Sequence, residues 1–231
     1  MIKTLLRDEW RFLTFRSVSP AVRDHWSAFL ALGLFFTWLA GIGRYWDNPR
    51  ASLWQHLGLG SVAYVFILAL IIWILLAPLR PKHWSYRNVL LFITLTAPPA
   101  LLYAIPVEKF MSTDNAVSAN IWLLAIVAAW RVALYAAFLR RTAQLRIGAV
   151  IVATLLPLAI IVVTLSALNL EHVVFNLMGG LRQNARSGND GAYIVVYTLS
   201  VISVLLAPLL AIAYIIYVFL AWRAARKEEY L

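Results

Sequence analysis

Six long apolar stretches run through this 231-residue chain and constrain its fold more than any other feature. A helix needs about 20 mostly apolar residues to cross about 30 Å of hydrocarbon, and only helices or closed barrels satisfy the backbone in lipid. Because the stretches are continuous and do not alternate with polar residues, we expect them to form helices. The predicted spans are residues 27–43, 57–79, 89–105, 117–139, 147–168 and 192–221.

Basic residues alternate between the connecting segments, and this alternation predicts the orientation. One side carries 14 Lys and Arg, the other carries 5, and Arg131 lies inside a span. Loops rich in Lys and Arg remain in the cytosol, so the 14-residue side is predicted to be cytosolic, together with both termini. We therefore expect an all-α integral membrane protein with six transmembrane helices, N-in and C-in.

The composition agrees with this class. Hydrophobic residues make up 63% of the chain and the mean hydropathy is +0.80, which excludes an ordinary soluble domain. The high pI reflects the excess of Lys and Arg on the side predicted to be cytosolic. It is weak evidence for nucleic-acid binding, because the chain has no basic domain that could bind nucleic acid. The chain has no Cys and no Asn-x-Ser/Thr sequon. Disulfide and iron–sulfur chemistry are therefore excluded, and a bacterial cytoplasmic (inner) membrane is the expected location.

The predicted organisation has three parts. Residues 1–26 form a cytosolic amphipathic segment, residues 27–222 form a single six-helix transmembrane domain, and residues 223–231 form a basic cytosolic tail. In the first segment, apolar residues recur at helical spacing, namely Ile2, Leu5, Leu6, Trp10 and Leu13. The opposite face is expected to carry Lys3, Arg7, Asp8 and Arg11. Such a helix is expected to lie on the inner leaflet, and an anchoring role is favoured over a docking site for a partner.

Two further segments outside the first five spans are informative. Residues 170–181 follow the i, i+3, i+4, i+7 pattern and predict an interfacial helix on the outer face between spans five and six. A re-entrant segment is the alternative, because Gly179 and Gly180 suit a broken helix. The last span is too long for the hydrocarbon core. It must tilt, bend at Pro208 or project from the membrane.

Arg131 is the outstanding candidate for a functional residue. It lies eight residues from the inner end of its span, about 12 Å deep by helical rise. Counted from the same face, Thr94, Thr96, Thr154 and Tyr214 reach a similar depth, so a polar cluster around Arg131 is expected. Such a cluster would contact an anion or lipid headgroup, or pin the helices by hydrogen bonds. An Arg131 that snorkels to the inner interface is an equally weighted alternative.

The third span is the second candidate site. Pro98 and Pro99 interrupt it, since each removes a backbone donor and forces a kink. The freed carbonyls near Thr94 need new partners, for example water in a cavity. Glu108 lies at the outer end of this span and is interpreted as a solvated loop carboxylate, although a place in a binding pathway remains an alternative.

Motifs for catalysis and metal binding are not found in the sequence. The four His residues lack metal-ligand spacing, and there is no phosphate-binding loop or dense acidic site. The Gly58-Leu-Gly-Ser61 stretch is expected to permit close helix packing at the outer end of the second span. We therefore predict no catalytic residue, no metal and no cofactor.

The order of motifs resembles the Yip1-like family of small polytopic membrane proteins. The likeness covers roughly residues 10–168 and rests on Trp84-Ser-Tyr-Arg-Asn-Val-Leu, on Pro99-Ala-Leu-Leu-Tyr-Ala-Ile-Pro106, on Ile121-Trp122 and on Arg140-Arg141. The family typically has five spans, whereas six are counted here. Eukaryotic members of that family are associated with membrane trafficking and small-GTPase partners, whereas its bacterial members have no settled activity, so the resemblance assigns no functional residue.

Three functions follow from these expectations, in decreasing order of preference. The first is a non-enzymatic component that binds membrane lipid or partner membrane proteins, including a second copy of the chain, and no nucleic acid. The second is a small transporter or channel subunit that uses Arg131 and the Pro-broken span. The third is an intramembrane enzyme that modifies lipid, which would need at least two converging acid–base groups.

Overall fold

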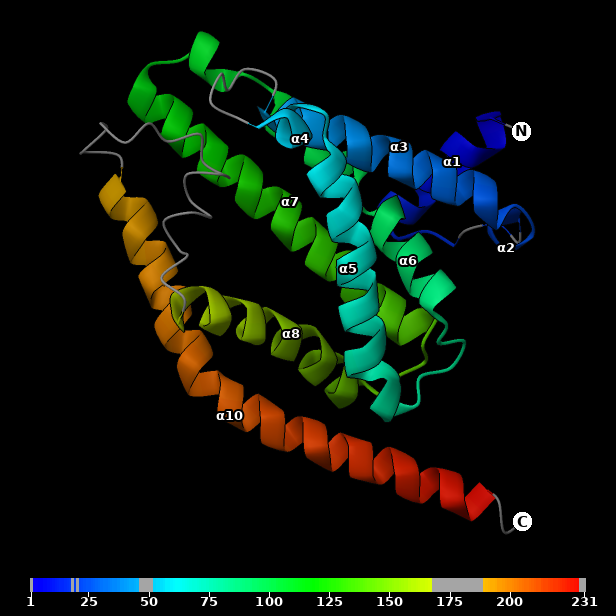
Figure 1. Cartoon of the computed structure of the whole chain (residues 1–231). Coiled ribbons are helices and arrows are strands. Elements are labelled where there is room, and N and C mark those ends of the chain that lie inside the picture. Colours follow the sequence, from blue (N-terminus) through cyan, green and yellow to red (C-terminus); the bar gives the residue numbers. More distant parts are fainter. Residues whose placement is uncertain (1, 18, 20, 46–51, 168–188, 229–231) are drawn as a thin grey trace.

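The computed structural model describes residues 2–17, 19, 21–45, 52–167 and 189–228, and every regular element in these ranges is helical (Figure 1). The α-helices are α1 (Ile2–Leu13), α2 (Ala21–Asp24), α3 (Trp26–Tyr45), α4 (Leu53–His56), α5 (Leu59–Leu76), α6 (Tyr86–Leu95), α7 (Thr113–Arg141), α8 (Ile147–Ala167) and α10 (Asn189–Glu228). Short 3-10 helices are η1 (Ala77–Leu79), η2 (Pro98–Ala104) and η3 (Val107–Lys109). The all-helical prediction is confirmed for the part of the chain that is described.

Five of the described helices are long and apolar enough to cross a membrane. Their apolar cores are Trp26–Gly43, Leu59–Leu79, Ser118–Arg141, Ile147–Thr164 and Thr198–Arg226. They overlap five of the six predicted stretches and indicate a multi-pass membrane protein. The predicted interfacial helix at residues 170–181 lies outside the described residues.

The remaining predicted stretch, residues 89–105, is not one helix but two short ones. Helix α6 ends at Leu95 and η2 begins at Pro98, as the prediction of an interruption at Pro98 and Pro99 required. Between them, the Ala97 N–H donates to the Thr94 carbonyl at 3.1 Å, so a tight turn supplies this carbonyl with a backbone partner.

The broken segment α6–η2 runs alongside α3 in a constant register. At its start, the Arg87 guanidinium lies 4.1 Å from the centre of the Trp26 ring. In the middle, a Cβ atom on Gly33 would come within 2.7 Å of the Thr94 Cβ, and at the far end a Cβ on Gly43 would collide with Ala104. Each pair is 61 positions apart in the chain. The two segments therefore run parallel over the length of α3.

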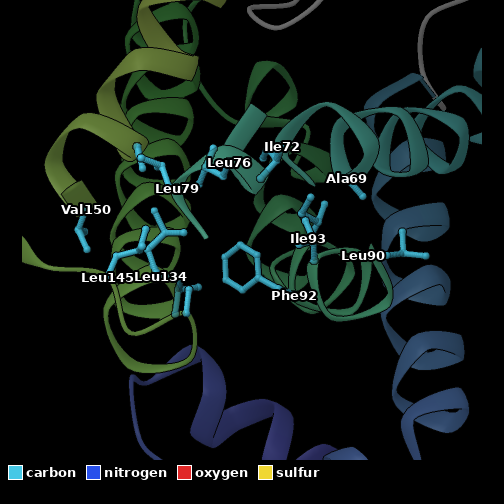
Figure 2. Packing of buried hydrophobic residues seen from close by; sticks show 14 of the residues in the cluster. Ala69, Ile72, Leu76, Leu79, Leu90, Phe92, Ile93, Leu134, Leu145 and Val150 are labelled. Carbon is cyan, nitrogen blue, oxygen red and sulfur yellow. The ribbon is translucent and has the colours of Figure 1, made fainter. Parts of the chain in front are cut away.

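Aromatic rings join α6 to its other neighbours in the largest buried cluster. The Phe92 ring stacks on Phe138 of α7 at a centroid distance of 4.3 Å and contacts the edge of Phe12 of α1 at 5.9 Å. Figure 2 shows Phe92 between residues of α5 and those of α7 and α8, with Leu134 and Leu145 on one side. The short α6 helix is thus at the centre of the apolar core, where aromatic contacts add to the burial of apolar area.

Segments that are rich in arginine meet at one end of the bundle. The Lys82 N–H, just after α5, donates to the Ala143 carbonyl, just after α7, at 3.0 Å. The indole N–H of Trp222 near the end of α10 donates to the Pro78 carbonyl at 3.1 Å. The ends of α5, α7 and α10 therefore lie together.

Small residues close the opposite end of α3 and α5. A Cβ on Gly41 would lie 2.8 Å from the Gly58 carbonyl oxygen and from the Ser61 hydroxyl. Gly58 adopts a positive φ of 66° and approaches the Trp38 carbonyl, a conformation that favours glycine. Close helix packing at the Gly58–Ser61 stretch was predicted and is confirmed.

The last helix, α10, extends beyond the predicted span at both ends and includes Pro208. Its axis changes direction along its length (Figure 1), as expected for a helix that contains proline. It packs against α8 and η1, and none of its most apolar stretch is buried in the protein. Most of its surface is therefore available to the membrane or to a partner.

Candidate functional site

The N-terminal helix α1 buries a different face from the one predicted. Its buried residues are Leu5, Asp8, Glu9 and Leu13. Asp8 was placed on the exposed polar face, and this prediction is wrong because the Asp8 side chain is fully buried. Positions 5, 8, 9 and 13 share one helical face, and packing against α3 and α6 covers that whole face, carboxyl groups included.

The opposite face of α1 is apolar and exposed. Ile2 and Trp10 are 71% and 61% exposed, Leu6 lies exposed between them, and Lys3 and Arg7 are exposed beside them. The apolar residues of α1 therefore form two stripes, one packed on the bundle and one turned outward. A helix of this kind can insert its outer stripe into one leaflet of a membrane while its basic groups reach the headgroups.

Glu9 is the most unusual ionisable group in the described part of the chain. Its side chain is 4% exposed, and neither carboxyl oxygen has a hydrogen-bond partner. Burial raises the pKa of Glu9 from 4.5 to about 8. The carboxyl group is therefore mostly protonated at neutral pH.

Asp8 lies beside Glu9 in the same buried face but is partly satisfied. The Ser19 hydroxyl donates to its Oδ2 atom, whereas its Oδ1 atom has no hydrogen-bond partner. A buried polar atom without a partner costs free energy, so two adjacent carboxyl groups of this kind mark α1 as a site of possible function.

Contacts at both ends hold the buried face of α1 in place. Leu5 packs with Phe29 of α3 and with Leu91 and Leu95 of α6. The chain just after α1 is fixed by the Arg141 guanidinium, which donates to the Phe15 carbonyl at 2.5 Å.

Glu9 was missed in the sequence, although a signal was present. Leu5, Glu9 and Leu13 are spaced by four residues, so a helix that buries both leucines also buries Glu9. Leu6 and Trp10, which are exposed in the structure, belong to the same apolar pattern as Leu5 and Leu13. The sequence pattern therefore predicts one apolar face and does not separate the buried face that contains Glu9. Tertiary packing decided which of the two apolar stripes became the core.

The predicted site residues on the broken span are buried and used in local bonds. The hydroxyl groups of Thr94 and Thr96 donate to the carbonyls of Leu91 and Ile93 at 3.0 and 2.7 Å. Such bonds satisfy the hydroxyls within their own helix. Thr94 is therefore a buried packing residue of α6, and Thr96 is buried directly after the end of that helix.

The other predicted residues are distributed over several helices. The Tyr214 hydroxyl donates to the Leu75 carbonyl of α5, and the buried Thr154 hydroxyl on α8 has no hydrogen-bond partner. Arg131 is half-buried and is not an unpaired charge. A cluster around Arg131 stays a prediction.

The two prolines are the first two residues of η2, directly after the break in the third stretch, and Pro99 is buried whereas Pro98 is half-buried. The side chain of Glu108 lies outside the described residues. No group of three or more His, Cys, Asp or Glu side chains that could hold a metal ion occurs in the described ranges.

Comparisons of the chain with protein families, with curated proteins and with solved structures found no match. The Yip1-like resemblance therefore stays a prediction.

Proposed function

We propose that the chain crosses the membrane six times, with both termini in the cytosol of a bacterial cell. The broken segment α6–η2 supports the sixth crossing. Helix α6 rises about 15 Å and η2 about 14 Å, at roughly 1.5 and 2.0 Å per residue, which together approach the thickness of the hydrocarbon core. The parallel register with α3 and the grouping of arginine-rich ends at one side also support this topology.

Side-specific labelling tests this topology directly. The chain lacks Cys, so single cysteines at Ser17 and Gln55 introduce unique reactive groups. An impermeant maleimide applied to intact spheroplasts is expected to label Q55C and to spare S17C. Equal labelling of both positions would contradict the proposal.

The role of the protein in that membrane is that of a non-enzymatic component that binds lipid or a partner membrane protein through α10. The observation that carries this function is the unburied apolar surface of Thr198–Arg226, a span of 29 residues whose main packing partners among the described elements are α8 and η1. A span attached to the bundle along one side presents a long apolar stripe to the bilayer. Such a stripe contacts lipid acyl chains, and a partner membrane helix can pack on it in place of lipid.

Native mass spectrometry of the protein in native-lipid nanodiscs tests this role. The variant L205A/L209A/I212A trims one exposed stripe of α10, and I67A/I71A/I74A trims an equally exposed stripe of α5 as the matched control. Loss of bound protein or of retained lipid only from the α10 variant is the expected result. Equal particles for wild type and both variants, without protein partner or selective lipid, would overturn the role.

A small transporter or channel is the second candidate, and the broken span favours it. The backbone break between Thr96 and Pro98 lies in a segment packed between α3 and α7. Discontinuous spans place free backbone groups beside transported ions in many transporters. In proteoliposomes, R131A is expected to abolish flux of a small inorganic anion such as chloride, and unchanged flux would exclude this candidate.

A further inference from the structure

The carboxyl group of Glu9 lies between two apolar clusters that clamp α1. One turn before it, Leu5 packs in the cluster with Phe29, Leu91 and Leu95. One turn after it, Leu13 packs in the large cluster around Phe92. Glu9, 4% exposed between these two anchored leucines, is held away from solvent while both remain in their clusters.

No described counter-charge compensates Glu9. Between Trp26 and Gly43, α3 carries no ionisable side chain. On α6, the Arg87 guanidinium stacks on Trp26, and the Tyr86 hydroxyl donates to the Phe66 carbonyl. On α1 itself, the neighbouring buried side chain is Asp8, which is another acid and provides no positive charge.

Helix α7, whose Trp130 contacts the end of α1, also carries ionisable groups. The Tyr135 hydroxyl donates to the Ala153 carbonyl at 3.4 Å, and Arg131 has a contact of its own. Burial is the cause that raises the pKa of Glu9, and no opposing charge lowers it. The docked position of α1 is thus compatible with a neutral Glu9 and penalises an ionised one.

We propose that Glu9 is a proton-binding site, and that uptake of one proton by its carboxylate locks α1 against α3 and α6. The ligand is a proton from the side of the membrane where the arginine-rich segments meet. Release of the proton converts the neutral carboxylic acid to a carboxylate, which is stable only where water reaches it. The helix then leaves its buried position and keeps its outer stripe of Ile2, Leu6 and Trp10 in the lipid.

The direction of the pH effect follows from linkage. The docked state holds Glu9 with a raised pKa, so it binds more protons than the undocked state between pH 4.5 and about 8. Docking is therefore strongest below pH 4.5, weakens as the pH rises through this window and changes little above it. Acidification closes this site, and alkaline conditions open it.

Spin-label distances in nanodiscs test the proposal. Since the chain has no Cys, labels at K3C on α1 and R146C before α8 report the position of α1 without interference. The wild-type background is expected to give a narrow distance distribution near about pH 5 and a broader, longer one near about pH 9. E9Q removes the titrating group and is expected to give the narrow distribution at both values. D24N, which changes an exposed carboxylate, is the matched control and is expected to behave as wild type.

Two results would overturn the proposal. One is an unchanged distance distribution between these pH values in the wild-type background. The other is a pH response that persists in E9Q, which would assign the effect to another group. Infrared spectroscopy adds a readout that does not depend on motion: a protonated-carboxyl band at neutral pH is expected in wild type and not in E9Q, and equal bands in both would also contradict the site.

Discussion

The indole N–H of Trp130 on α7 donates to the carbonyl oxygen of Leu13, the last residue of α1, at 2.9 Å, although the two residues are 117 positions apart in the chain. Leu13 is buried, so water does not replace this donor readily. Trp130 lies about 16 Å along α7 from Arg141, the last residue of that helix, so the end of α1 contacts α7 well away from its end. The C-terminal end of α1 is thus built into the bundle rather than resting on its surface.

Replacing Trp130 by Phe is expected to loosen α1. The ring remains but the Leu13 carbonyl loses its donor, at a cost of about 1–3 kcal/mol for a buried group left unsatisfied. Hydrogen exchange of the α1 amides in nanodiscs is expected to accelerate. Trp122, 69% exposed on the same helix, provides the control, because W122F should leave α1 exchange unchanged.

A methyl group at Gly33 is expected to destabilise the pairing of α3 with the broken span. Its Cβ would lie 2.7 Å from the Thr94 Cβ and 2.8 Å from the Thr94 backbone, so either helix must shift. We expect G33A to lower the free energy of unfolding by about 1–3 kcal/mol, measured by thermal or denaturant unfolding in detergent.

Gly60 supplies the matched control for that experiment. A Cβ on Gly60 would meet no atom within 4 Å, and Gly60 lies in the first turn of α5. G60A is expected to be neutral or to stabilise by about 0.5–1 kcal/mol, because alanine favours a helix. Equal destabilisation by G33A and G60A would show that close packing at Thr94 is not the cause.

Thr154 and Tyr214 are expected to respond in opposite ways when their hydroxyl groups are removed. The Thr154 hydroxyl is buried without a partner, so T154V is expected to leave stability unchanged or raise it by about 1 kcal/mol. An intact T154V protein that loses lipid or partner binding would reveal a functional role for this hydroxyl.

The Tyr214 hydroxyl, in contrast, bonds the Leu75 carbonyl and ties α10 to α5. Y214F is expected to cost about 1 kcal/mol and to loosen α10, measured by thermal unfolding and by proteolysis of the C-terminal part. Unchanged stability in Y214F would mean that the contacts of α10 with α8 and η1 hold it without this hydrogen bond.

The overall stability is expected to decrease as the pH rises from 4.5 to about 8, since the folded state binds the additional proton of Glu9. At about 1.36 kcal/mol per pH unit, the full effect amounts to about 5 kcal/mol if α1 unfolds with the bundle. Unfolding of wild type and E9Q in detergent at several pH values measures it. The stability of E9Q should be flat across this window, and parallel curves for the two proteins would contradict the assignment.

Several features of the fold could be predicted because they depend on local sequence. Apolar length identifies a spanning helix, as for residues 147–168 and α8, since the bilayer demands it of each segment separately. The interruption at Pro98 and Pro99 was equally accessible, because a proline lacks its backbone donor in any context. The close approach at Gly58 followed from the absence of side chains.

The candidate site at Glu9 could not be predicted in this way. The sequence of α1 contains two apolar stripes, and its pattern is compatible with burial of either one. The sequence alone determined the environment of the chain, its helices and the alternation of its charges, since each of these depends on residues close together in the chain. Only the tertiary structure decided that Asp8 and Glu9 are enclosed and that residues 87–104 run in register with α3. Both outcomes depend on contacts between distant segments, where packing of Leu5, Leu13 and Gly33 outweighs the local preference of a carboxyl group for water.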